Sequence, residues 1–147
     1  MSNTAASQNL KAGSFVLIGI ALGIALIFNS ANGLCNSYAL MQLRPDLGTL
    51  PLITGLLLFA LGALMHQHSD RALRRLRKPG ESGYFVPNGG AYRWVSCPNY
   101  LGEILQWTGF AIAAGTSAAW VFAFFTVCNL VPRALTHHRW YLETFSD

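Results

Sequence analysis

Three long stretches of this chain carry no Asp, Glu, Lys or Arg, and they restrict the possible folds more than any other feature. The stretches run over residues 12–43, 47–69 and 104–132. A helix that spans a bilayer needs roughly 20 mostly apolar residues, and each stretch reaches that length. Only 11% of all residues are charged, against about 25% in an ordinary soluble domain. The sequence therefore predicts an integral membrane protein.

The apolar stretches predict an all-α fold, a polytopic membrane bundle of about four embedded helices. A Gly-Thr-Ser break at residues 115–117 divides the third stretch into two helices of about 14 to 16 residues, which would be tilted or partly interfacial. The expected helices cover residues 14–40, 50–66, 100–114 and 117–130. We divide the chain into a polar tail, residues 1–13, and a membrane domain, residues 14–147.

Basic residues gather on one side of the predicted membrane helices. Five of the ten Lys and Arg residues lie between Arg71 and Lys78. Loops that face the cytosol carry an excess of Lys and Arg, so we expect residues 70–98 and the C-terminus at the cytosolic side. A loop of this composition suits an anionic ligand or the anionic headgroups of membrane lipids, and composition alone leaves both open.

Glu103 is the most informative single residue, because it stands at the start of an apolar stretch. An ionisable group inside a membrane segment is costly and suggests a functional site. Asn99 precedes it by four residues, so the two side chains would share one helix face. A position at the membrane surface, where Glu103 stays solvated, is the alternative.

Two other groups of polar residues have helical spacing. His66 and Asp70 are four residues apart and could pair at the cytosolic end of their helix. Arg133, His137 and Tyr141 follow one another at the same spacing and would form one polar face. Arg suits bidentate contacts with phosphate, although such a face could equally anchor the chain at the membrane surface.

Several other kinds of site are not predicted. The four His and three Cys residues show no metal-binding spacing, so no metal site is expected. No glycine-rich nucleotide fingerprint of the soluble folds is present, and no nucleophile arrangement is visible. The basic segment is short and lies between membrane helices, which favours lipid or nucleotide over nucleic acid.

The polar segments together resemble a known family, the steroid 5-alpha-reductases. The segments that carry the resemblance are HSD at 68–70, LRKPGE at 76–81, SCPNYLGE at 96–103, FAFF at 122–125, PRA at 132–134 and HHRWYL at 137–142. An NG pair at residues 32–33 matches an element on an earlier helix. The resemblance covers about residues 14–147, and the LRKPGE and SCPNYLGE segments are its most specific parts.

The resemblance implies a helical membrane reductase that uses NADPH and transfers a hydride to the C=C bond of an enone lipid, such as a 3-oxo-delta-4 steroid. It assigns phosphate contacts to Arg77 and Arg133. It places Glu103 at the nicotinamide end, as the nearest candidate for a catalytic residue, but it identifies no catalytic residue in this chain. The other implied cofactor contacts are Asn32, Asp70, Tyr84, Asn99, His137 and Tyr141.

The chain also departs from the family pattern. The family's N-terminal helices carry the Gln or Glu and the Tyr that polarise the substrate carbonyl, and no equivalents are found here. We therefore expect an NADPH-dependent reductase or only its cofactor-binding half; in the second case, the missing N-terminal helices would come from another chain. Two alternatives remain: an S-adenosylmethionine-dependent membrane methyltransferase of isoprenylcysteines or phospholipids, and a non-catalytic, truncated membrane module.

Overall fold

The computed structural model describes residues 2–43, 45–76, 87 and 89–145, with side chains from Ser14 onward. Four α-helices and one 3-10 helix make up the described residues, and no β-strand occurs among them, so the all-α prediction is confirmed. Their bounds are α1 Ser2–Gln42, α2 Thr49–Leu76, η1 Gly90–Arg93, α3 Pro98–Ala114 and α4 Ser117–Phe145. The chain divides into two units, residues 1–38 and 39–147, and each is described by itself.

Three of the helices are long and apolar enough to cross a membrane. They are residues 14–42 of α1, all of α2 and all of α4, with mean hydropathies of 2.2, 1.8 and 1.5 in their most apolar windows. α3 has 17 residues, which corresponds to a length of about 26 Å at the usual rise. The prediction of an all-helical membrane protein with about four helices is confirmed, and three of the four are long and apolar enough to span the membrane.

The predicted ends of α2 and α4 are wrong, and α2 continues to Leu76 instead of ending at residue 66. We expected a short helix ending at residue 130, but α4 continues to Phe145 and contains Pro132 in its interior. Proline removes only one backbone hydrogen bond and is tolerated in membrane helices when nearby groups replace it. The bond that proline removes here is the one to the Cys128 carbonyl, and the helix continues regularly past it; one turn later the hydroxyl of Thr136 donates to the Pro132 carbonyl at 3.0 Å. The polar residues after Pro132 therefore extend a membrane helix instead of starting a separate one.

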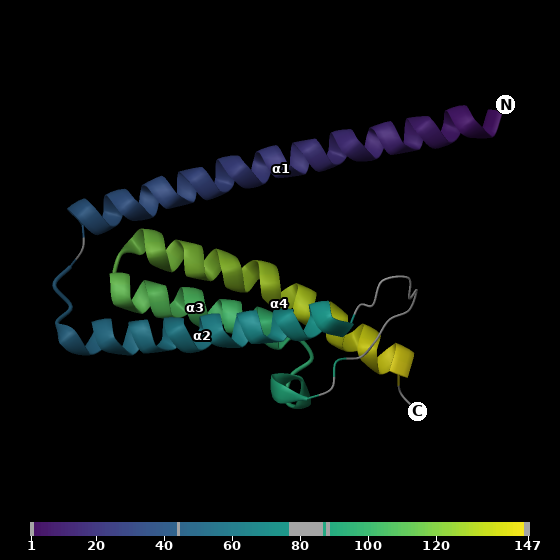
Figure 1. The fold of residues 1–147 in the computed structure, drawn as a ribbon. Coiled ribbons are helices and arrows are strands. Elements are labelled where there is room, and N and C mark those ends of the chain that lie inside the picture. The colour runs from purple at the N-terminus through teal and green to yellow at the C-terminus, as the bar shows by residue number, and fades with distance from the viewer. Residues whose placement is uncertain (1, 44, 77–86, 88, 146–147) are drawn as a thin grey trace. The chain divides into compact units, whose positions relative to one another are not determined.

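α2 and α3 run antiparallel in close backbone contact at four glycines, which we call the glycine seam: Gly55, Gly62, Gly102 and Gly109. A Cβ atom added at Gly62 would lie 2.6 Å from the carbonyl oxygen of Gly102. One added at Gly55 would lie equally close to the carbonyl oxygen of Gly109. Small residues allow two helix backbones to approach in this way, and Cα–H groups can then contact carbonyl oxygens. Figure 1 shows these two helices side by side.

The turn between α3 and α4 lies where the sequence predicted a break. Gly115 has a left-handed conformation, with φ 66°, and its N–H donates to the Ala111 carbonyl. The hydroxyl of Thr116 then accepts the N–H of Ala119 at 3.3 Å, as a cap of α4. Further along the two helices from this turn, Trp107 of α3 packs edge-on against Phe122 of α4, with ring centroids 4.7 Å apart.

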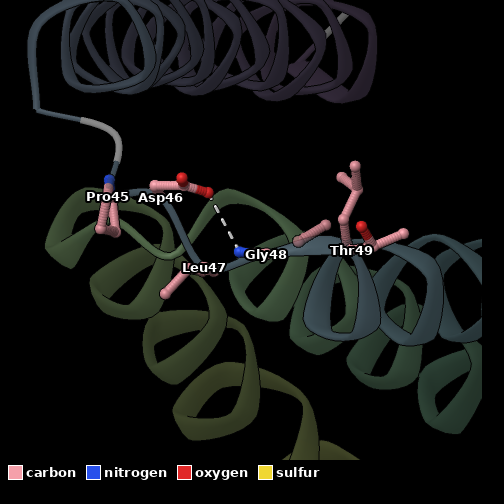
Figure 2. A pocket seen from close by; sticks show the side chains of 7 residues that line it. Pro45, Asp46, Leu47, Gly48 and Thr49 are labelled. Carbon is pink, nitrogen blue, oxygen red and sulfur yellow. Dashed lines mark hydrogen bonds between the residues drawn. The ribbon is translucent and has the colours of Figure 1, made fainter.

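The loop before α2 covers the same turn and encloses a cavity of about 450 Å³ (Figure 2). The carboxylate of Asp46 accepts the N–H of Gly48 at 3.1 Å, which closes the loop on itself. A Cβ added at Gly115 would collide with the side chain of Leu47. The cavity lies beside the first turn of α2, at the opposite end of that helix from His66 and Asp70.

Candidate functional site

A polar network joins the C-terminal part of α2 to the first turn of α3. Asn99 donates its amide hydrogen to the Asp70 carboxylate at 3.3 Å. His66 Nδ1 forms a hydrogen bond of 3.1 Å with the backbone carbonyl of Asn99, and its Nε2 lies 3.9 Å from Asp70. The predicted pairing of His66 with Asp70 is therefore confirmed. Both side chains are about one-third exposed, at 31% and 32%, so the network is open to a ligand.

The glycine seam explains why these residues meet. Because α2 and α3 are antiparallel, the end of one helix lies beside the start of the other. A Cβ at Gly102 would lie 2.5 Å from the backbone nitrogen of His66. The close approach of the backbones brings the His66 ring within hydrogen-bonding distance of Asn99, which lies near the start of α3. α3 itself begins with Pro98, a favoured residue in the first helical position.

η1 is held against the same part of α2. The hydroxyl of Tyr92 donates to the backbone carbonyl of Ser69 at 3.2 Å. A Cβ at Gly90 would lie 3.5 Å from Nε2 of His68. Ser69 is only 1% exposed, and its hydroxyl has no hydrogen-bond partner among the described residues. Buried hydroxyls usually have such a partner, so Ser69 leaves hydrogen-bonding capacity beside Asp70.

Glu103 lies one turn beyond Asn99 on α3 and follows Gly102 of the glycine seam. Its side chain is half-buried. Within the described part of the chain it forms no ion pair. A carboxylate at this depth is costly without a partner, and the cost is smaller when a ligand or solvent supplies hydrogen bonds. Glu103 and the polar network thus lie near the same end of α3.

The predicted polar face of α4 lies beside α3. His137 packs its ring against Tyr100, the residue after Asn99, with ring centroids 6.1 Å apart. Arg133 is exposed one turn earlier, and Tyr141 is half-buried one turn later. The structure therefore brings His137 to the end of α3 that carries Asn99, with Arg133 and Tyr141 one turn away on either side along α4.

For three predicted residues the structure gives no position relative to this group. Asn32 belongs to α1 in the first unit, where its side-chain oxygen accepts a hydrogen bond of 3.0 Å from Asn36. Arg77 and Tyr84 fall outside the residues that the structure describes. Their assignment as cofactor contacts remains a prediction.

Sequence reasoning missed a contact between the loop before α3 and α4. The hydroxyl of Ser96 and Nδ1 of His138 form a hydrogen bond of 2.7 Å. The next residue, Cys97, is half-buried, and burial raises the pKa of its thiol. Ser96 belongs to the SCPNYLGE segment and His138 to the HHRWYL segment, so the family resemblance already pointed to both segments. Their pairing could not, because it depends on how α4 packs against α3.

The sequence matches the profile of the family described as 3-oxo-5-alpha-steroid 4-dehydrogenase over residues 14–147. It is 45% identical over 128 residues to 3-oxo-5-alpha-steroid 4-dehydrogenase 1 of Mus musculus, covering 84% of this chain and 50% of the relative. It is 46% identical over 129 residues to 3-oxo-5-alpha-steroid 4-dehydrogenase 2 of Macaca fascicularis, covering 85% and 50%. The chain thus spans about half the length of these relatives. It belongs to the 3-oxo-5-alpha-steroid 4-dehydrogenase family.

Proposed function

We propose that this chain forms the cofactor-binding part of an NADPH-dependent membrane reductase. The reaction would transfer a hydride to the C=C bond of an enone lipid, with a 3-oxo-delta-4 steroid as the model substrate. Family membership and the names of the relatives support a reductase of the steroid type. The observation that carries the proposal is the network of His66, Asp70 and Asn99, because it joins the HSD segment, through Asp70, to the SCPNYLGE segment, through Asn99, at one helix end.

The residues present fit a nicotinamide dinucleotide. Ribose hydroxyls and carboxamides need both donors and acceptors, and Asp70 and Asn99 supply both on one turn of α2 and the facing turn of α3. Glu103 adds a half-buried carboxylate one turn further along α3. We assign Asp70, Asn99 and Glu103 to the ribose and nicotinamide end.

Phosphate contacts would come from arginine, because its guanidinium forms paired hydrogen bonds with phosphate oxygens. Arg133 on α4 is exposed and available for this role, with His137 and Tyr141 on the same helix face. Arg77 and Tyr84 complete the proposed set from the segment after α2. Asn32 of α1 is the remaining proposed contact.

Bound NADPH would supply the hydride, and the chain's own residues would orient it and keep water away. Asn99 is held by Asp70, so its amide has one fixed orientation. The apolar part of α2 continues directly from the polar network, and a reacting group at that boundary would lie in a water-poor region. The protein then contributes position and electrostatic environment.

We also propose that the basic residues after His66 and the end of α4 face the cytosol, where NADPH is available. Arg74 and Arg75 lie in the last turn of α2, and Arg133 and Arg139 follow the apolar part of α4. The excess of basic residues at this side supports that orientation. Groups that hold the enone substrate would come from helices outside these 147 residues, on the same polypeptide or another.

Thermal unfolding of the detergent-solubilised chain tests the proposal. NADPH at about 100 times its dissociation constant would stabilise the fold by about 2.7 kcal/mol and raise Tm. Asn99→Ala removes a hydrogen-bonding amide from the network and should weaken NADPH binding about three- to ten-fold. Asn129→Ala is the matched control, because this amide only donates to the Phe125 carbonyl within α4.

Three outcomes would contradict the proposal. The first is the absence of an NADPH-dependent rise in Tm in the unaltered chain. The second is an NADPH-dependent rise in Tm that is equal in Asn99→Ala and Asn129→Ala. The third is stabilisation by S-adenosylmethionine in place of NADPH, which would favour a methyltransferase.

A further inference from the structure

A second cavity, of about 370 Å³, lies between α3, α4 and the loop that follows η1. It is on the α4 side of α3, whereas the network of Asp70 and Asn99 is on the α2 side. Its volume falls within the range of about 300 to 1,000 Å³ that is typical of small-molecule sites. The proposed reductase function leaves this cavity without a role.

The walls of the cavity are apolar and its polar groups lie at one end. Leu101 and Ile104 of α3 face Val131 and Leu135 of α4 across it. The hydrogen bond between Ser96 and His138 joins the loop to α4 at the polar end. Apolar walls with a few converging polar groups are characteristic of sites for amphiphilic ligands.

The cavity also crosses the boundary between apolar and polar parts of the chain. The charge-free stretch of α4 ends at Pro132, and the lining continues from Val131 to His138. At the rim, the side chain of Trp94 is 88% exposed. Tryptophan is enriched at the level of lipid headgroups. A ligand in this cavity would therefore have its apolar part at the depth of the hydrocarbon and its polar part among the headgroups.

Two arginines that adjoin lining residues in the sequence favour an anionic ligand. Arg93 and Arg139 are both exposed, and each is the chain neighbour of a lining residue, Trp94 and His138 respectively. No acidic residue is among the described residues that line the cavity. Basic residues near a membrane surface attract acidic lipids, by about five-fold in affinity for each Lys or Arg.

We propose that this cavity binds one acyl chain of an acidic membrane phospholipid. The acyl chain would lie between Leu101 and Leu135, and the phosphate would lie at the end where Ser96 and His138 are joined, flanked by the two arginines. The proposal concerns lipid binding alone. It does not depend on a nicotinamide dinucleotide in the network on the other side of α3.

Native mass spectrometry of the purified full chain tests the proposal. The chain would be exposed to phosphatidylglycerol and phosphatidylcholine with identical acyl chains. We expect one phosphatidylglycerol retained per chain, with a preference of at least about ten-fold over phosphatidylcholine from the two arginines. Arg93→Ala should lower that preference about five-fold, and because Arg93 is exposed its replacement should leave the fold intact.

A size substitution tests the apolar part of the site. Leu135→Trp would fill the cavity and should reduce phosphatidylglycerol retention at least about five-fold, since a pocket must enclose most of its ligand. Leu64→Trp makes the same change at an exposed position of α2 and should have no effect. Circular dichroism would verify the helical content of both variants. Equal retention of the two lipids, or equal retention in the two Trp variants, would overturn the proposal.

Discussion

Replacing Gly62 by alanine tests the glycine seam most directly. The added Cβ would lie 2.6 Å from the Gly102 carbonyl oxygen and 2.8 Å from the Cα atom of Gln106. These are backbone atoms of α3, so no flexible side chain can move aside. Ordinary contacts of this kind are about 3.5 Å or longer, so the two helices must separate by about 1 Å.

The expected loss of stability follows from two opposing effects. Forcing one extra methyl into a packed interface costs about 1 to 3 kcal/mol. Alanine is favoured over glycine inside a helix by about 0.5 to 1 kcal/mol, which offsets part of this cost. We therefore expect Gly62→Ala to lower the free energy of unfolding by up to about 2.5 kcal/mol, with a central value of about 1 kcal/mol. In a chain of this size each kcal/mol corresponds to a fall in Tm of roughly 2 to 4 °C.

Thermal unfolding in detergent, followed by circular dichroism at 222 nm, measures this effect. Gly19→Ala is the matched control, because it makes the same change at an exposed position of α1. It should leave Tm unchanged or raise it slightly, through helix propensity alone. A Tm of Gly62→Ala equal to or above that of Gly19→Ala would refute the close backbone contact between α2 and α3.

Three further predictions concern single side chains. Asp70→Ala leaves the amide of Asn99 without its acceptor, and isothermal titration should show NADPH affinity lowered about ten-fold. Trp107→Ala removes the edge-on contact with Phe122 and should destabilise the chain by about 3 to 5 kcal/mol, measured as a fall in Tm, whereas Trp107→Phe should cost less. Burial raises the pKa of the Cys97 thiol, so its alkylation by iodoacetamide should become rapid only at higher pH than in the denatured chain, as peptide mass spectrometry can measure.

The sequence predicted the helices well because the signal for a membrane helix lies within each segment. Absence of charge located α2 and the apolar part of α4, and the Gly-Thr-Ser break located the turn at Gly115. The end of α4 was not predicted, because the polar residues after Pro132 look like the end of a membrane span. A span and the helix that contains it need not end together, since the helix can continue into the headgroup region and beyond.

The candidate site was predictable in part, for a related reason. Spacing within one helix gave the pairing of His66 with Asp70 and placed Glu103 one turn from Asn99. Contacts between helices depend on their register, which no local pattern encodes. The bond from His66 to the Asn99 carbonyl and the bond between Ser96 and His138 are both of this kind. The family resemblance pointed to the right segments, but it did not say which atoms meet.

The glycine seam supplies that register and so connects stability to the site. Four glycines, two on α2 and two on α3, meet backbone atoms of the neighbouring helix. Gly62 and Gly102 lie within two turns of His66 and Asn99, so the network forms only where the two backbones come this close. A side chain at either glycine would move the helices apart by more than a hydrogen bond of 3.1 Å can lengthen before it is lost. The absence of two side chains therefore determines the geometry of the polar groups proposed to bind the cofactor.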